Sequence, residues 1–242
     1  MKKGIVVGAS SGMGNEVARL LLEDGWTLGL AARRTEPLEA LAKENPGRVF
    51  VKKIDVMSSD AAELLQELID DMGGIDLYFH AAGVGWQNHK LDESKEMTTV
   101  ETNALGFTRL VGVAYRFFAS KGKGHIVVIS SIAGTKGLGV APAYSATKAF
   151  QNVYIQALEQ QANMRHLGIR FTDIRPGFVR TALLSDGTSY PLLMNPKKVA
   201  KEIVSSIYKG RHVRVIDWRY RVLTFFWRLL PGWLWRRLSI HN

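Results

Sequence analysis

Apolar runs rich in valine, isoleucine and leucine recur along the chain, and each is followed by a stretch with helical spacing. Several runs are continuous rather than alternating, as in HIVVIS at 125–130, which predicts strands covered by helices on both faces. The expected strands lie near residues 4–8, 27–32, 48–54, 75–80, 124–130, 169–175 and 212–216. The expected helices lie near residues 12–24, 36–44, 59–72, 96–120, 143–166 and 197–209. This alternation predicts an α/β fold with one doubly wound parallel β-sheet of the Rossmann type.

Composition fits one globular domain and excludes several kinds of site. The chain has 242 residues, 46% of them hydrophobic and 22% charged, with no linker, repeat or low-complexity block. We expect a domain over residues 1–216 and a tail over 217–242. The absence of cysteine excludes disulfides, a thiol nucleophile and cysteine metal sites, so we predict no metal site. It also fits a reducing, cytoplasmic location. No apolar stretch reaches the roughly 20 residues of a membrane span.

The excess of positive charge is confined to the end of the chain. The net charge is +10, and residues 211–242 contribute +6 of it through seven arginines and one aspartate. A basic surface spread over the whole domain would indicate nucleic acid. Since the charge is concentrated in the tail, we expect no nucleic-acid partner.

The tail has the pattern of an amphipathic helix. On a helix over 217–230, one stripe contains Trp218, Val222, Phe225, Phe226, Leu229 and Leu230, and the opposite stripe contains Asp217, Arg221, Thr224 and Arg228. Pro231 and Gly232 end this helix. The apolar stripe either packs against the protein or a partner subunit, or lies on an anionic membrane surface. The density of tryptophan and arginine favours the second interpretation, a peripheral position at the inner membrane surface.

The first predicted strand runs into a glycine-rich turn, and a helix follows. Gly8, Gly12 and Gly14 allow a sharp turn and close approach of a ligand. The start of the helix presents free N–H groups and the positive end of its dipole, and a pyrophosphate suits both. Ser10 and Ser11 add hydroxyl donors. Such a turn can also be a simple connection, but its position between strand and helix favours nucleotide binding.

The end of the second strand distinguishes between two cofactors. An NAD site usually has an acidic residue here for the ribose 2′-hydroxyl, whereas an NADP site offers arginine to the 2′-phosphate. The strand is followed by Arg33 and Arg34, and a guanidinium group matches phosphate with two parallel hydrogen bonds. We therefore predict NADP(H). Asp55, after the third strand, either accepts from the adenine amino group or caps the helix that begins near Ser58.

Three residues in the second half of the chain carry the candidate chemistry. Tyr144 and Lys148 lie four positions apart at the start of a predicted helix, and therefore on one face of it. A nearby ammonium group would lower the tyrosine pKa from about 10, which would suit proton transfer near neutral pH. Ser131 follows a buried strand, where its hydroxyl can donate to a developing alkoxide. Each residue alone has a structural explanation, but the combination with the glycine turn is specific.

Taken together, these motifs resemble the short-chain dehydrogenase/reductase family over about residues 4–210. The resemblance rests on the glycine motif at 8–14, on His80-Ala81-Ala82-Gly83, on Asn103, on Ser131 with Y-S-A-T-K at 144–148, and on Arg175-Pro176-Gly177 followed by Thr181. Two positions depart from the family pattern. Val7 stands where threonine is frequent, and His80 stands in a motif that is usually rich in asparagine. We expect His80 to be structural rather than to transfer protons.

The resemblance implies a catalytic tetrad of Asn103, Ser131, Tyr144 and Lys148. Ser131 would polarise the carbonyl, Tyr144 would act as acid in reduction and base in oxidation, and Lys148 would bind the nicotinamide ribose. Asn103 would hold a water molecule that relays protons to Lys148. The complete set of predicted cofactor-binding residues is Gly8, Ser10, Ser11, Gly12, Met13, Gly14, Arg33, Arg34, Asp55, Val56, Ala82, Gly83, Tyr144, Lys148, Pro176, Gly177, Val179 and Thr181.

These features predict an NADPH-dependent oxidoreductase that interconverts a ketone or aldehyde and an alcohol. The resemblance implies that the segment after Thr181 forms a substrate lid. Its leucines either provide an apolar floor for a hydrophobic, lipid-like or steroid-like substrate or simply pack within the lid. The resemblance also implies a homodimer or homotetramer. The alternative is a catalytically idle NADP-binding sensor or scaffold. The presence of Ser131, Tyr144 and Lys148 argues against it.

Overall fold

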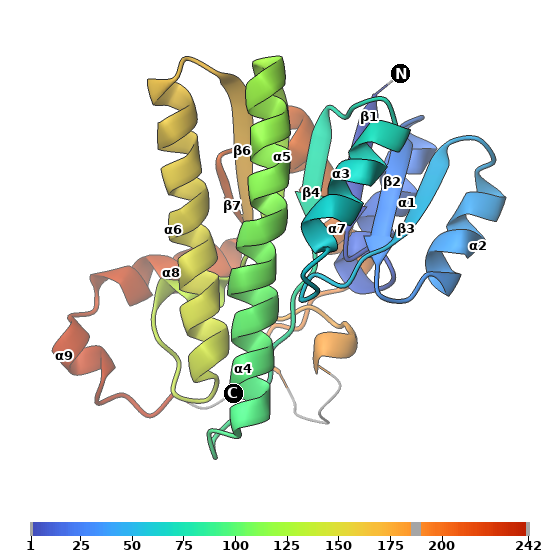
Figure 1. The fold of residues 1–242 in the computed structure, drawn as a ribbon. Coiled ribbons are helices and arrows are strands. Elements are labelled where there is room, and N and C mark those ends of the chain that lie inside the picture. The colour runs from blue at the N-terminus through green and yellow to red at the C-terminus, as the bar shows by residue number, and fades with distance from the viewer. Residues whose placement is uncertain (1, 185–189, 241–242) are drawn as a thin grey trace.

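A seven-stranded parallel sheet forms the centre of the computed structural model, which describes residues 2–184 and 190–240 (Figure 1). The strands are β1 (Lys3–Val7), β2 (Thr27–Ala32), β3 (Val49–Lys53), β4 (Leu77–His80), β5 (Lys123–Ile129), β6 (Gly168–Arg175) and β7 (Val213–Val215). Their order is β3-β2-β1-β4-β5-β6-β7, and every neighbouring pair is parallel. This confirms the predicted doubly wound sheet. The order reverses between β1 and β4, where connections leave in opposite directions and open a crevice at the carboxyl ends of the strands.

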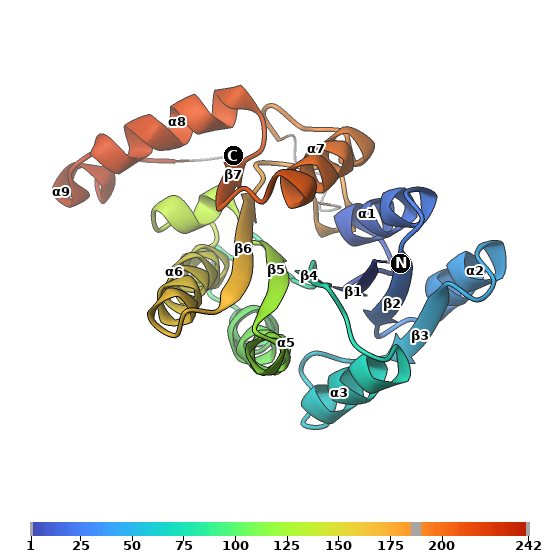
Figure 2. The ribbon, with the colours of Figure 1, turned by 90° about the horizontal axis from the view of Figure 1, so that it is seen from above.

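Helices cover both faces of the sheet (Figure 2). One apolar core includes side chains of α1 (Gly12–Glu23), α2 (Glu36–Glu44) and α7 (Pro196–Lys209). The other includes side chains of α3 (Ala61–Asp71), α5 (Phe107–Lys121) and α6 (Pro142–Met164). Strand β1 explains this arrangement, since Ile5 and Val7 pack into one core and Val6 into the other. Two 3-10 turns, η2 (Ile132–Thr135) and η3 (Ala182–Leu184), follow β5 and β6.

The long helix expected near 96–120 differs in detail. Asp92 accepts a hydrogen bond from the Ser94 backbone at 3.0 Å and starts α4 (Glu93–Val100) earlier than expected. A π-helical turn, η1 (Glu101–Gly106), then separates α4 from α5. A Cβ atom on Gly106 would lie 2.4 Å from the carbonyl oxygen of Val56. The helix can therefore pass close to the end of β3 here. Such turns occur often at functional sites, and this one carries Asn103.

The tail forms α8 (Trp218–Leu229) and the short α9 (Gly232–Trp235), with the predicted break at Pro231. The orientation of α8 excludes one of the alternatives for its apolar stripe, because this stripe does not pack against the rest of the described chain. Trp218, Phe225 and Leu229 are each about 60% exposed, whereas Tyr220 and Thr224 are buried. Thr224, assigned to the polar stripe, therefore belongs to the packed face. No helix in the described part of the chain is long and apolar enough to span a bilayer.

Candidate active site

A cavity of about 950 Å³ occupies the crevice at the carboxyl ends of the strands. Its volume is at the upper end of the usual range for ligand pockets. Every predicted cofactor-binding residue is on its lining, from the glycine turn through Arg33, Asp55 and Gly83 to Thr181. Ser131, Tyr144 and Lys148 line it too, whereas Asn103 is fully buried behind it.

The glycine turn forms a close-packed cradle for an anion. Gly8 has a φ of +88°, and a Cβ atom there would lie 2.5 Å from the backbone nitrogen of Ala82. A Cβ atom on Gly14 would lie 2.2 Å from the carbonyl oxygen of Gly8. At the start of α1, the Ser11 side chain makes no capping hydrogen bond and the first turn contains no acidic residue. The helix N-terminus can therefore donate to a phosphate, and these residues fit the pyrophosphate of a dinucleotide.

We predict that Gly8→Ala destabilises the protein more than Gly25→Ala does. Both glycines have similar positive φ angles, +88° and +83°, but a Cβ atom on Gly25 would meet nothing within 4 Å. The Gly25 variant therefore measures backbone strain alone, about 1 kcal/mol. Gly8→Ala adds a collision with Ala82 and should cost at least about 1 kcal/mol more. Urea unfolding of both variants checks this difference, and equal losses would contradict the close packing at Gly8.

Two predicted cofactor-binding regions lie at the far end of the cavity. Arg33 and Arg34 are exposed directly after β2, on the cavity lining. Asp55 also lines the cavity, and its side chain accepts a hydrogen bond from the backbone of Met57 at 3.1 Å. The following helix begins later than expected, at Ala61, with Asp60 at its N-cap. Asp55 therefore orders the turn after β3 rather than capping that helix, and it still faces the cavity.

Ser131, Tyr144 and Lys148 meet at the inner end of the cavity. The Ser131 hydroxyl accepts from the Ala133 backbone at 3.1 Å, which fixes it at the start of η2. The Lys148 ammonium lies 5.7 Å from the centroid of the Tyr144 ring and donates to the carbonyl oxygen of Ile129 at 3.0 Å. The serine, the phenol and the ammonium group thus line the same end of one pocket.

The expected effect of Lys148 on Tyr144 is not found. Burial raises the pKa of Tyr144 above its ordinary value, and a hydrogen bond with Ser131 only partly opposes this rise. Burial also lowers the pKa of Lys148 to about 8, although the charge of Asp173 favours the ammonium form. The helical spacing correctly predicted the shared face. It could not predict how strongly burial in the surrounding protein shifts the pKa values of both groups.

Gln151 is a neighbour of the site that the sequence did not reveal. Its side-chain oxygen accepts from the Lys148 ammonium at 2.9 Å, and its amide nitrogen donates to the carbonyl oxygen of Asn103 at 2.8 Å. Asn103 is in turn held by two hydrogen bonds with the backbone of Val84, at 2.9 and 2.7 Å. The link between Asn103 and Lys148 therefore runs through a side chain. Position 151 follows Lys148 by three residues, so helical spacing could have indicated it.

His80 is buried at the end of β4. Its Nδ1 atom is 2.8 Å from the Tyr78 hydroxyl, and its ring packs edge-on against Phe107. Among the described residues, its Nε2 atom has no hydrogen-bond partner. Burial, reinforced by the charge of Lys148, lowers the pKa of His80 to about 3. The imidazole is therefore neutral at physiological pH.

His80 should make the protein less stable in mild acid. Its folded pKa is about 3 and its ordinary value 6.5, so below pH 6.5 the unfolded chain takes up a proton that the folded chain does not. The free energy of unfolding should fall by about 2 kcal/mol between pH 7 and pH 5 through this residue. His80→Asn should abolish that part of the loss, measured by urea unfolding at both pH values. An unchanged loss of unfolding free energy in this variant would show that His80 is not responsible. His125, with a pKa of about 4, contributes in the same direction and is still present in the variant.

The outer end of the cavity is mainly apolar. Its lining here includes Trp86, Leu138, Leu183, Tyr190 and Trp227. Part of the expected lid, residues 185–189, lies outside the described residues. Trp227 is on α8, so the tail contributes directly to the wall of this cavity.

Several hydrogen bonds fix the tail against the loops of the site. The Tyr220 hydroxyl accepts from the Phe178 backbone at 3.3 Å and donates to the carbonyl oxygen of Pro191 at 2.8 Å. A Cβ atom on Gly177 would lie 2.2 Å from the Tyr220 ring. The indole nitrogen of Trp235 donates to the carbonyl oxygen of Gly137 at 2.7 Å. The tail therefore supports two loops that line the cavity.

This combination of fold and site is that of an oxidoreductase that uses a nicotinamide dinucleotide. The short chain dehydrogenase family matches residues 2–189. The chain is 31% identical to an uncharacterized oxidoreductase of Myxococcus xanthus, over 96% of this chain and 93% of that one. It is 32% identical to an uncharacterized oxidoreductase of Mycobacterium tuberculosis, over 98% and 97%.

Solved structures share this fold. A short-chain dehydrogenase from Streptomyces avermitilis superposes with a TM-score of 0.81 at 24% identity, over 95% of this chain and 93% of that one. Actinorhodin polyketide ketoreductase with NADPH superposes with a TM-score of 0.77 at 26% identity, over 89% and 95%. The chain belongs to the short-chain dehydrogenase family, and it is an NAD(P)-dependent enzyme that acts on CH–OH or C=O groups.

Proposed function

We propose that this protein is an NADPH-dependent reductase of a hydrophobic ketone or aldehyde, with Tyr144 as the proton donor. The observation that carries the proposal is the position of Ser131, Tyr144 and Lys148 on the lining of the cavity that also contains the glycine cradle. A dinucleotide anchored at the cradle would extend toward these three residues. The same site would support oxidation of the corresponding alcohol.

Ser131 and Tyr144 would bind the oxygen of the carbonyl group. When bound, NADPH supplies the hydride that the carbonyl carbon accepts. The Ser131 hydroxyl would donate to the oxygen as negative charge develops there, and so stabilise that charge. The raised pKa of Tyr144 keeps its phenol protonated at neutral pH, so it can transfer the proton to the oxygen.

Lys148 and Gln151 support the tyrosine from within the protein. Lys148 would hold the ribose of the nicotinamide, and its ammonium group is kept in place by Ile129 and Gln151. The chain of hydrogen bonds from Lys148 through Gln151 to the backbone of Asn103 positions the ammonium group. We assign Gln151 as a positioning residue on this basis.

Two observations support NADPH as the preferred cofactor. Arg33 and Arg34 are exposed at the end of the cavity where an adenosine ribose would lie, and guanidinium groups bind phosphate strongly. The polyketide ketoreductase with 26% identity was solved with NADPH. The apolar outer lining, with Trp86, Leu138 and Trp227, supports a hydrophobic substrate. The number of subunits, two or four, and the cytoplasmic location stay predictions.

NADPH consumption over a panel of aldehydes, ketosteroids and 3-ketolipids tests the proposal. We expect turnover with at least one hydrophobic carbonyl compound, and less with short polar ones. NADPH binding should be measured separately by fluorescence. Tight NADPH binding without turnover of any member would favour the alternative, an idle NADP-binding sensor or scaffold.

A further inference from the structure

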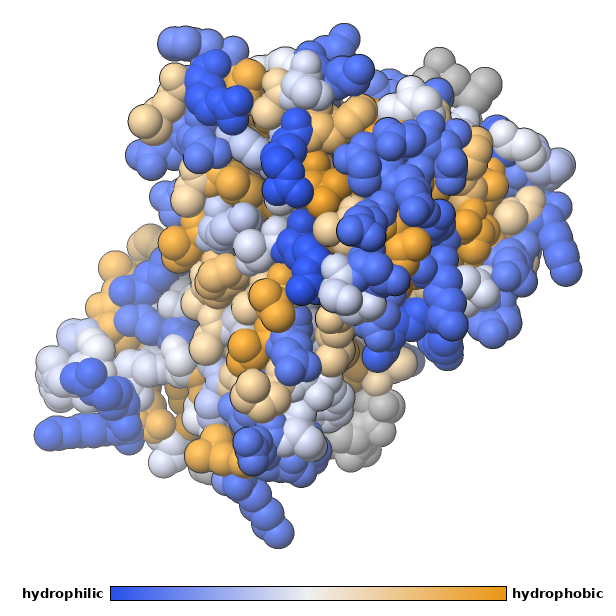
Figure 3. All heavy atoms as spheres, viewed as in Figure 1, coloured by the Kyte–Doolittle hydropathy of each residue, from blue (hydrophilic) through white to orange (hydrophobic). Residues whose placement is uncertain are grey.

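We propose that the α8–α9 segment, residues 218–235, binds the surface of an anionic phospholipid bilayer. The outer face of α8 is apolar and unpartnered within the described chain. Trp218, Val222, Phe225, Phe226 and Leu229 are between 45% and 65% exposed, and Trp233 on α9 is 58% exposed. Figure 3 shows hydrophobic and hydrophilic side chains side by side at the lower left, where this segment projects from the body of the protein.

The exposed face belongs to a well-anchored helix. Tyr220 and Thr224 are buried on its inner side, and Lys136 donates to the carbonyl oxygen of Leu230 at 3.1 Å. Trp227 and Trp235 pack edge to face with ring centroids 5.3 Å apart. Because the inner side is already occupied, the outer stripe cannot be buried by rotating the helix.

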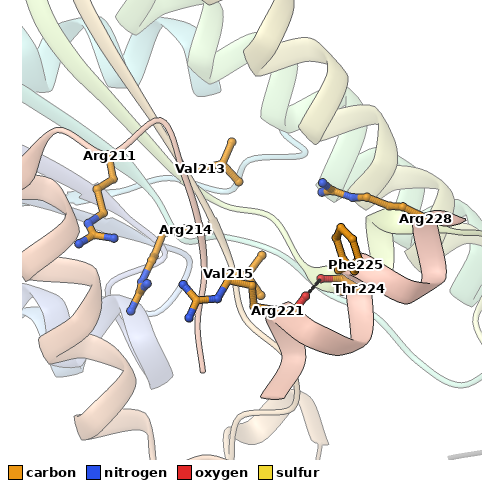
Figure 4. A pocket seen from close by; sticks show the side chains of 8 residues that line it. All are labelled: Arg211, Val213, Arg214, Val215, Arg221, Thr224, Phe225 and Arg228. Carbon is orange, nitrogen blue, oxygen red and sulfur yellow. Dashed lines mark hydrogen bonds between the residues drawn. The ribbon is translucent and has the colours of Figure 1, made fainter. Parts of the chain in front are cut away.

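Arginines flank the apolar face and give it a strong positive charge. Figure 4 shows Arg211, Arg214, Arg221 and Arg228 around one hollow of about 240 Å³ between β7 and α8, with the Phe225 ring beside it. In the described part of the chain, Arg214 pairs with Glu202, but no salt bridge reaches Arg211, Arg221 or Arg228. Unpaired guanidinium groups beside exposed aromatic rings are suited to phosphate headgroups and to the boundary of the acyl chains.

The charge also argues against a second copy as the main occupant. A two-fold interface places the same patch of both copies together, so the arginines of one copy would face those of the other. The only acidic residue of the tail, Asp217, is already bound to Arg219 at 2.7 Å. An anionic bilayer compensates this charge, whereas a second copy would increase the repulsion.

Docking at a bilayer would place the cavity near its substrate. Trp227 lines the cavity from the inner side of the same helix whose outer side carries Phe225 and Phe226. A hydrophobic carbonyl compound dissolved in the bilayer would then be close to the apolar end of the cavity. This last step rests on the proposed function, but docking itself does not.

Vesicle co-sedimentation of the full-length protein tests the proposal without using its activity. We expect binding to vesicles of phosphatidylglycerol and phosphatidylcholine, weakened by salt, and at least tenfold weaker binding to pure phosphatidylcholine. The double variants Phe225→Ser/Phe226→Ser and Arg221→Gln/Arg228→Gln should each weaken binding about tenfold or more. Met164→Ser, which removes a 75% exposed apolar residue at the end of α6, is the matched control and should bind normally.

Thermal unfolding and NADPH binding show whether each variant is folded, since neither double variant alters the dinucleotide cradle. Equal binding to neutral and anionic vesicles, or full binding by both tail variants, would overturn the proposal. The proposal would also be overturned by two results together: the wild-type protein does not bind vesicles, and the Phe225→Ser/Phe226→Ser change converts a dimer to a monomer in sedimentation velocity. That result would assign the face to a second copy of the chain.

Discussion

Tyr144→Phe should lower kcat for carbonyl reduction by about 10²- to 10⁴-fold, the range typical of a lost general acid. Phenylalanine keeps the half-buried ring in place but has no proton to transfer to the carbonyl oxygen. The fold should be unaffected, because the substitution removes a single hydroxyl group, which interacts with Ser131 within the site. Steady-state kinetics with the best substrate from the carbonyl panel measures the change.

Two controls separate a chemical effect from a structural one. NADPH affinity of the Tyr144 variant should stay within about threefold of that of the wild type, since the glycine cradle that would hold the pyrophosphate is a different part of the cavity lining. Tyr154→Phe, on the same helix but outside the cavity lining, should retain full activity. Undiminished turnover by Tyr144→Phe would refute the assignment of the proton donor and with it the proposed mechanism.

Replacing Arg33 and Arg34 together with alanine should weaken NADPH binding about 100-fold while NADH binding changes little. Each substitution would remove a charge-assisted contact with the 2′-phosphate, and such contacts contribute about 1.5–3 kcal/mol to binding when well formed. Both side chains are exposed, so the lower part of that range applies. Fluorescence titration with the two cofactors gives the ratio of affinities directly.

Arg165→Ala is a suitable control, because Arg165 is an exposed arginine at the end of α6, away from the cavity. It should leave both affinities unchanged. If the Arg33→Ala/Arg34→Ala variant still prefers NADPH over NADH as the wild type does, these residues do not recognise the 2′-phosphate. The proposed cofactor preference would then have no support in this region.

The fold could be predicted because its signals are local. Continuous apolar runs followed by helical spacing indicated all seven strands, and the glycine turn marked the crevice where β1 meets α1. Tyr144 and Lys148 were placed on one face by their spacing alone. The π-helical turn around Asn103, where Gly106 lies close to Val56, was not predicted from the sequence.

The errors share one physical origin, which is burial by distant parts of the chain. Spacing on α8 predicted the apolar stripe but assigned Thr224 to the exposed polar side, whereas it is buried. The side that faces the protein also carries Tyr220, which fits under Gly177 and hydrogen-bonds to Phe178. The pKa of Tyr144 rises for a related reason, because burial by the surrounding protein raises it and a hydrogen bond with Ser131 only partly opposes the rise.

The anchoring of Tyr220 and Trp235 has a practical consequence for recombinant work. A truncation at residue 217 would remove Tyr220 and Trp235, disturb the loops at Phe178 and Gly137, and so alter catalysis through the shape of the pocket. Lys3 begins β1, at the amino-terminal end of the strand, whereas the cavity lies at the carboxyl ends of the strands. A purification tag is therefore better fused to the N-terminus, and the last helices are better studied by point substitution than by deletion.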